Sequence, residues 1–135
     1  MEHAELVSLL GKNDAFETAP PEALEKLVDS AELISLEPGT SLISQGKSGE
    51  SIWLLIDGEI DVFVDGEAVN HISERGAVVG EISAVSQTPA TATVQSKGQV
   101  KALSIPQESL HGVMKTSPQL AASILRSMAK YLGRR

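Results

Sequence analysis

The 135-residue sequence predicts a mainly β fold, in which an antiparallel β-roll of the jelly-roll type carries helices at both ends. Helical periodicity is confined to the residues before 32 and after 106, while turn dipeptides that end in glycine punctuate the stretch between them. The spacing of these dipeptides leaves room for about eight short strands. The turn dipeptides are Pro38-Gly39, Gln45-Gly46, Asp57-Gly58, Asp65-Gly66, Arg75-Gly76 and Lys97-Gly98.

Residues 1–31 are predicted to form the N-terminal helices. Pro20-Pro21 separates two helical segments, and a proline at the first helical position followed by acidic residues is typical of a helix start. Each segment has an apolar stripe at helical spacing, formed by Leu6, Leu9 and Leu10 in the first and by Leu24, Leu27 and Val28 in the second.

Residues 32–106 are predicted to form the β-roll. In the stretch Glu59 to Val64, polar and apolar residues alternate, so that Ile60, Val62 and Val64 share one face of a strand. Asp65-Gly66 follows this strand and predicts a two-residue hairpin, because such turns require positive φ angles that glycine adopts readily. A meander of this kind closes into a sandwich or barrel.

Residues 107–135 are predicted to form two C-terminal helices. The first is short, with Leu110, Val113 and Met114 on its apolar face. The second begins at Ser117-Pro118, because serine is a favoured N-cap and proline suits the first turn. Its apolar stripe is predicted to consist of Leu120, Ile124, Leu125, Met128 and Leu132, before the helix ends at Gly133.

Composition limits the possible functions of this chain. The net charge of −7 argues against nucleic-acid binding, which needs a surplus of lysine and arginine. Residues 1–96 contain 17 acidic and 4 basic side chains, whereas residues 97–135 contain 1 acidic and 7 basic side chains. The basic C-terminal segment is either a solvated helix face or a surface that attracts an anionic ligand or an acidic partner.

The sequence predicts neither disulfides nor membrane insertion. It has no cysteine, which excludes a disulfide framework, a thiolate nucleophile and a cysteine-rich zinc site. The longest strongly apolar run, Ile52 to Ile56, is too short to span a bilayer, and the acidic start lacks the basic flank of a secretory signal. We therefore expect one cytoplasmic domain comprising residues 1–135.

Enzyme activity is not expected. Ser41 to Ser48 ends like a phosphate-binding P-loop, but Ser41 stands where the first glycine is required. No nucleophile elbow is present, and no metal site is predicted, because the histidines lack ligand spacing and are expected to be surface or cap residues. The three histidines are His3, His71 and His111.

The order of these elements resembles the cyclic-nucleotide-binding domain family, which includes bacterial catabolite activator proteins and protein kinase A regulatory subunits. The resemblance covers essentially the whole chain and rests on an ordered series of glycines at the expected strand corners. Its residues are Glu37-Pro38-Gly39-Thr40, Gln45-Gly46, Gly49, Ile52 to Ile56 ending in Gly58, and Val79-Gly80-Glu81-Ile82-Ser83 running to Thr88-Pro89.

This resemblance implies that residues 80–94 are the phosphate-binding cassette, with a short helix from Glu81 to Ser86. Gly80 would let the backbone approach the ligand, Glu81 would accept a hydrogen bond from a ribose 2′-hydroxyl, and the following amides would bind an anion. Alternatively, Glu81 only caps the short helix. The ligand-binding residues implied are Gly80, Glu81, Ile82, Ser83, Ala90 and Thr91.

The cassette departs from the family pattern at Ala90, where the family has an arginine that meets the cyclic phosphate. A lost charge-assisted hydrogen bond typically costs about 1.5–3 kcal/mol, which corresponds to roughly 10- to 150-fold in affinity. Thr91 could place a hydroxyl near a phosphate oxygen or a guanine amino group, or could be only a strand threonine.

Two functions therefore stay open from the sequence. In the first, the domain is a sensor for a cyclic nucleotide, with cAMP or cGMP as candidates, or for a related nucleoside. It would signal through its C-terminal helices to an effector domain or protein, with Lys130, Tyr131 and Arg134 as candidate contacts to the base. In the second, a degenerate domain binds no nucleotide and serves as a protein-interaction or dimerisation scaffold. No cofactor is expected in either case.

Overall fold

The computed structural model describes residues 1–132 and contains eight strands and five helices in the predicted order. Every strand pair is antiparallel, and the strands form two four-stranded sheets, ordered β1-β8-β3-β6 and β2-β7-β4-β5. The jelly-roll prediction is therefore confirmed. The strands are β1 Glu32–Leu36, β2 Ser41–Ile43, β3 Ser51–Asp57, β4 Ile60–Val64, β5 Glu67–Ile72, β6 Val78–Val79, β7 Thr93–Ser96 and β8 Val100–Pro106.

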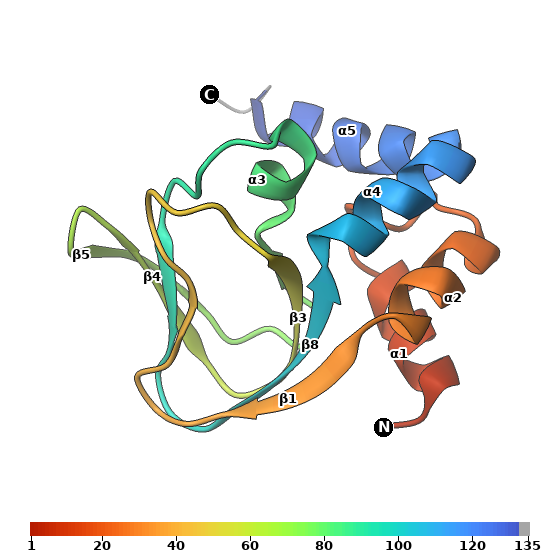
Figure 1. The fold of residues 1–135 in the computed structure, drawn as a ribbon. Coiled ribbons are helices and arrows are strands. Elements are labelled where there is room, and N and C mark those ends of the chain that lie inside the picture. The colour runs from red at the N-terminus through yellow and green to blue at the C-terminus, as the bar shows by residue number, and fades with distance from the viewer. Residues whose placement is uncertain (133–135) are drawn as a thin grey trace.

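The helices lie on one side of the roll. Figure 1 shows α1, α2, α4 and α5 grouped beside the sheet that contains β1, β8 and β3, with the β4–β5 ribbon at the opposite side. The short helix α3 lies between β6 and β7 within the roll, as predicted for the cassette. The helices are α1 His3–Gly11, α2 Pro21–Asp29, α3 Glu81–Ser86, α4 Gln107–Thr116 and α5 Pro118–Leu132.

The hairpin between β4 and β5 has the predicted turn. Asp65 and Gly66 both have positive φ angles, 53° and 83°, which is the backbone conformation that Asp-Gly favours. Gln45 fixes this turn from outside, since its side-chain amide donates to Asp65 Oδ1 and its Oε1 accepts from the Asp65 backbone N–H, both at 2.9 Å.

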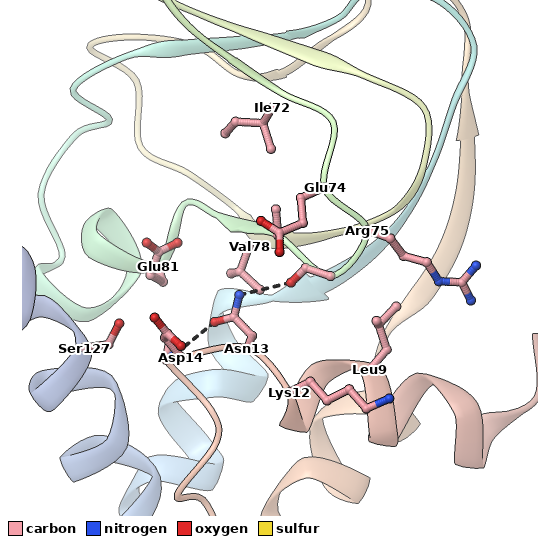
Figure 2. Close-up of a pocket in the computed structure, with 13 residues that line it drawn as sticks. Leu9, Lys12, Asn13, Asp14, Ile72, Glu74, Arg75, Val78, Glu81 and Ser127 are labelled. Atoms are coloured by element: carbon pink, nitrogen blue, oxygen red, sulfur yellow. Dashed lines mark hydrogen bonds between the residues drawn. The ribbon is translucent and has the colours of Figure 1, made fainter.

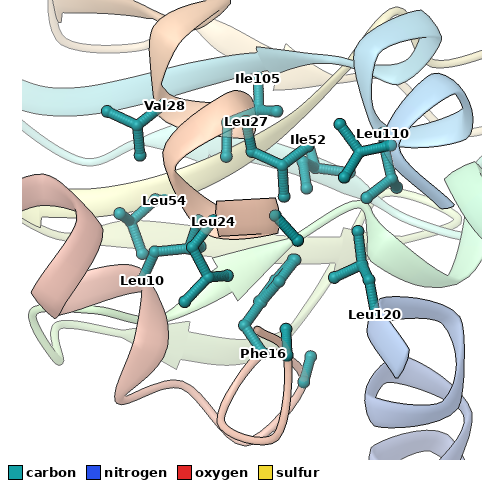
Figure 3. Close-up of a cluster of buried hydrophobic side chains, with 14 of the residues drawn as sticks. Leu10, Phe16, Leu24, Leu27, Val28, Ile52, Leu54, Ile105, Leu110 and Leu120 are labelled. Carbon is teal, nitrogen blue, oxygen red and sulfur yellow. The ribbon is translucent and has the colours of Figure 1, made fainter. Parts of the chain in front are cut away.

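The apolar interior consists of two clusters, because alternate residues of a strand point to opposite faces of its sheet. On β3, Ile52 and Leu54 pack toward the helices, where they meet Leu10, Phe16, Leu27 and Leu120 (Figure 3). Leu55 belongs to the second cluster, which lies between the two sheets and also contains Leu36, Ile60, Val94, Val100 and Ala102.

Helix α5 packs through a narrower stripe than the sequence indicates. Leu120 and Ile124 are fully buried, and Met128 packs against the same cluster. Leu125 is 55% exposed, so its assignment to the apolar stripe is wrong. Successive helical residues are separated by about 100°, and the buried face of α5 includes Ser123 and Ser127 instead. The Ser123 hydroxyl accepts from the Thr18 backbone N–H in the loop between α1 and α2.

Within the described residues 1–132, no helix has the length and apolarity needed to cross a membrane. The same part of the chain contains no group of three or more histidine, aspartate or glutamate side chains arranged to hold a metal ion.

His71 bridges two carboxylates on the surface of the β4–β5 ribbon. Its Nδ1 lies 2.7 Å from Asp61 Oδ1, and its Nε2 lies 2.8 Å from Glu59 Oε1. The hydrogen bonds to Asp61 and then to Glu59 raise the pKa of His71 above its usual value, with Lys97 and desolvation opposing them weakly. The protonated ring can donate to both carboxylates at once, which the neutral ring cannot.

We expect His71 to make the stability of the domain depend on pH. Because the folded state raises the pKa, the stabilisation is fully present below the unfolded pKa of about 6.5 and is lost as the pH rises through the folded pKa. Replacing His71 by glutamine should therefore lower the melting temperature at pH 5.5 and have little effect at pH 9. The double variant Glu59→Gln/Asp61→Asn is the control, and in that background the imidazole NMR titration should return to the usual range. Titration of His71 at or below pH 6.5 in the wild type would contradict the bridge.

Candidate functional site

The cassette begins at a position that only glycine fits. Gly80 precedes α3 with a φ of 91°, in the left-handed region, and a Cβ there would lie 3.1 Å from Ile43 Cδ1 and 3.3 Å from the Ser51 carbonyl oxygen. This conformation turns the chain from β6 directly into α3. As a result, Glu81 is the first residue of the helix.

Short-range hydrogen bonds hold α3 in place. The Ser83 hydroxyl donates to the Thr88 carbonyl, and the Ser86 hydroxyl lies 2.7 Å from both the Ile82 carbonyl oxygen and the Thr88 hydroxyl. From outside the cassette, His111 Nε2 of α4 lies 2.7 Å from the Ala84 carbonyl oxygen and donates to it. The partly buried His111 side chain thus links α3 to α4, a role that its position in the sequence did not indicate.

Glu81 is the buried polar group of the site. Its Oε2 is buried and has no hydrogen-bond partner among the described residues. Burial raises the pKa of Glu81, while its own backbone N–H acts in the opposite direction. An unpaired buried acceptor destabilises the folded protein, and a hydrogen-bond donor on a ligand would remove this cost.

Glu81 lines a cavity of about 510 Å³ beneath the roll (Figure 2). The loop after α1, the turn before β6 and helix α5 close this cavity, and Ser127 and Asp14 lie at the same end as Glu81. A volume of this size is in the range of small-molecule sites. The N-cap of α3 is Gly80, which has no side chain, so the start of this helix has no side-chain cap hydrogen bond from the N-cap residue.

Ala90 is buried, and its methyl side chain provides no charge at the position where the family has an arginine. Its backbone N–H donates to the Lys47 carbonyl at 3.0 Å, and its carbonyl accepts from the Gly46 N–H at 2.8 Å. Ala90 is 7% exposed, yet it is the one buried apolar residue of the described chain that belongs to neither apolar cluster. Ala90 does not line the cavity that Glu81 lines.

The remaining predicted ligand residues differ in exposure. Ile82 is 51% exposed on the outer side of α3, whereas Ser83 is half-buried and bonded within the cassette. Thr91 is exposed in a bend, because β7 begins only at Thr93, so the interpretation of Thr91 as a strand threonine is wrong.

The candidate base contacts lie at the end of α5. Lys130 is exposed, and its Nζ lies 3.7 Å from Glu17 Oε1 in the loop between α1 and α2. Tyr131 belongs to the helical backbone of α5, and Arg134 lies outside the described residues.

The part of the site that the sequence did not predict comes from the loop after α1. The Asn13 side-chain amide donates to the Gly76 carbonyl at 3.0 Å, and Asn13 Oδ1 accepts from the Ala15 N–H at 2.9 Å. Asn13 and Gly76 are 63 positions apart, so no local pattern could indicate that they meet.

Comparison with known proteins identifies one family. Residues 33–117, well over half of the chain, match the family model described as the cyclic nucleotide-binding domain. A cAMP-dependent protein kinase regulatory subunit from Colletotrichum orbiculare is 33% identical over 91 residues, which are 66% of this chain and 23% of that protein. The matched region is thus about a quarter of the length of this curated relative.

Two solved structures illustrate the shared fold. The regulatory subunit of a cAMP-independent protein kinase A from Trypanosoma cruzi, bound to guanosine, has a TM-score of 0.76 at 19% identity over 84% of this chain and 41% of that chain. The corresponding Trypanosoma brucei protein is a triple mutant with a threonine-to-arginine change and is bound to cAMP in the A site. It has a TM-score of 0.76 at 23% identity, over 85% of this chain and 43% of that chain.

Proposed function

The chain belongs to the cyclic nucleotide-binding domain family, and from this membership we propose that it is a regulatory domain that senses a nucleoside-type ligand through Glu81. The observation that carries the proposal is the buried, unpaired Oε2 of Glu81 at the wall of a cavity. A ribose hydroxyl is a donor of the kind that this oxygen lacks. We infer a regulatory rather than an enzymatic role, in keeping with the kinase regulatory subunit among its relatives.

We further propose that the domain prefers a neutral nucleoside to a cyclic nucleotide. Ala90 offers no charge to a cyclic phosphate placed beside it, and an anion at that buried position without a counter-ion is costly. The guanosine-bound structure of a cAMP-independent regulatory subunit supports this preference, because guanosine has no phosphate. The expected penalty for cAMP is roughly 10- to 150-fold in affinity relative to a site with the arginine.

The ionisation of Glu81 should be coupled to binding. A hydroxyl donor favours the carboxylate form, whereas burial in the free protein favours the protonated form and raises the pKa. Ligand binding should therefore release a proton when the pH lies near the raised pKa. Affinity should fall as the pH is lowered through that value.

Amide chemical-shift titrations with guanosine, adenosine, cAMP, cGMP and cyclic dinucleotides test this proposal. We expect the nucleosides to shift the amides of residues 80–86, with cAMP and cGMP binding more weakly. Glu81→Gln keeps the size of the side chain but removes the carboxylate, so it should weaken nucleoside binding by about 10-fold. Its matched control is Glu74→Gln, a change at an exposed carboxylate of the same cavity. If no nucleoside or cyclic nucleotide shifts these amides, the proposed sensor function is wrong, and a protein-interaction or dimerisation scaffold becomes the better account.

For the output, we propose that the ligand signals through α4 and α5 to an effector domain or partner protein. The hydrogen bond from His111 to the Ala84 carbonyl connects α3 to α4. A ligand that moves α3 would therefore also move the C-terminal helices. Homodimerisation stays a prediction, as does a cytoplasmic location, with which the cysteine-free sequence is compatible.

A further inference from the structure

Two unpaired cations lie at the end of the cavity opposite Glu81. Lys12 and Arg75 both line the 510 Å³ cavity, and Figure 2 shows them at one end, with Glu81, Ser127 and Asp14 at the other. We propose that this cavity binds an open nucleoside 5′-monophosphate, with the ribose hydroxyls at Glu81 and the phosphate at Lys12 and Arg75. This inference rests on the proposed binding of a nucleoside at Glu81 and adds the class of ligand that the site prefers.

The convergence of Lys12 and Arg75 is unusual in this chain. Residues 1–96 have only 4 basic side chains against 17 acidic ones, and 2 of those 4 line the same cavity. Both are exposed, and within the described residues 1–132 neither lies within ion-pair distance of a carboxylate. Both cations therefore line the cavity without a direct ion pair, and a bound phosphate would provide one.

One hydrogen bond joins the two chain segments that carry the cations. Asn13 donates to the Gly76 carbonyl at 3.0 Å, and a cation immediately precedes each of these residues. Lys12 precedes Asn13, and Arg75 precedes Gly76. The loop after α1 and the turn before β6 are therefore held face to face.

The backbone at Gly76 allows this close approach. Gly76 has a φ of 95°, and a Cβ there would lie 3.1 Å from Leu9 Cδ1 of α1. The turn can therefore pack directly against the first helix only because glycine occupies this position. The backbone position of Arg75 is thus set by the fold, and its guanidinium also donates to Met1 Sδ at 3.4 Å.

The opposite end of the cavity is suited to hydroxyl donors. Glu81 provides a buried acceptor, and the Asp14 carboxylate lies at the same end of the cavity (Figure 2). Carboxylates accept hydrogen bonds from hydroxyl groups and repel phosphate. A ligand with hydroxyls at one end and an anion at the other matches this distribution, whereas the phosphate of a cyclic nucleotide is tied back to the ribose, away from the two cations.

Calorimetry with paired ligands tests the inference. The pairs are guanosine with 5′-GMP and adenosine with 5′-AMP, so that only the phosphate differs within a pair, and cGMP and cAMP complete the set. In the wild type we expect each monophosphate to bind at least about 5-fold more tightly than its nucleoside, with a preference that decreases as salt is raised. In Lys12→Gln/Arg75→Gln, that preference should disappear while nucleoside binding is unchanged.

Lys26→Gln is the matched control, because Lys26 is an exposed lysine on α2 that does not line this cavity. It should keep the preference for the monophosphate. Equal affinity for nucleoside and monophosphate in the wild type, or a preference that survives in the double variant, would overturn the inference and leave nucleoside sensing intact. If neither member of a pair binds, both the inference and the proposed function are wrong.

Discussion

Replacing Ile124 by aspartate is expected to lower the free energy of unfolding by at least about 3 kcal/mol. Ile124 is completely buried on α5, within the cluster that joins the helices to β3 and β8. The change removes apolar contacts and also places a carboxylate among them with no partner. Because a domain of this size has a total stability of about 5–15 kcal/mol, the melting temperature should fall by roughly 10 °C or more. Thermal and urea unfolding followed by circular dichroism measure the change.

Leu125→Asp provides a matched control one position further along the same helix. Leu125 is 55% exposed, so the same substitution there should change the stability by no more than about 0.5 kcal/mol. Equal destabilisation by the two variants would contradict the packing of α5 described here. Solution mass measured for both variants would also reveal whether either face of α5 takes part in a dimer.

The sequence predicted the roll well because its signals are local. The Asp65-Gly66 turn, the start of α2 at Pro21 and the cassette helix all depend on residues that are close in the chain. The assignment of Leu125 to the apolar stripe was wrong for the opposite reason, since the width of the buried face depends on what packs against the helix. Only the contact with other elements shows that Ser123 and Ser127 are the buried residues of that face.

The candidate site was predictable only in part. The cassette resemblance identified Gly80 and Glu81, and the structure gives Gly80 a conformation that requires glycine. The cavity that Glu81 lines depends on Asn13 and Gly76 meeting, and on α5 placing Ser127 at the Glu81 end. These contacts join three distant segments of the chain, so neither the periodicity nor the spacing of residues could predict them.

Replacing Ala90 by arginine is expected to strengthen binding of cAMP and cGMP by about 10-fold or more. Ala90 is buried but belongs to neither apolar cluster, so the substitution does not replace a residue of the apolar core. The guanidinium would supply the charge-assisted hydrogen bonds that a cyclic phosphate lacks at this site.

Calorimetry on Ala90→Arg, Ala90→Gln and Ala90→Arg/Glu81→Gln separates charge from size and from the ribose contact. Glutamine adds length and polarity without charge, so it should give little of the gain. Removing the carboxylate of Glu81 in the arginine background should reverse part of it, because the ribose would lose its acceptor. An unpaired arginine in a buried position is costly, so the free Ala90→Arg protein should melt below the wild type, and cAMP should restore the melting temperature. If arginine and glutamine give the same cAMP affinity, the phosphate of the ligand does not lie beside residue 90, and a cavity remodelled for another ligand becomes the better account.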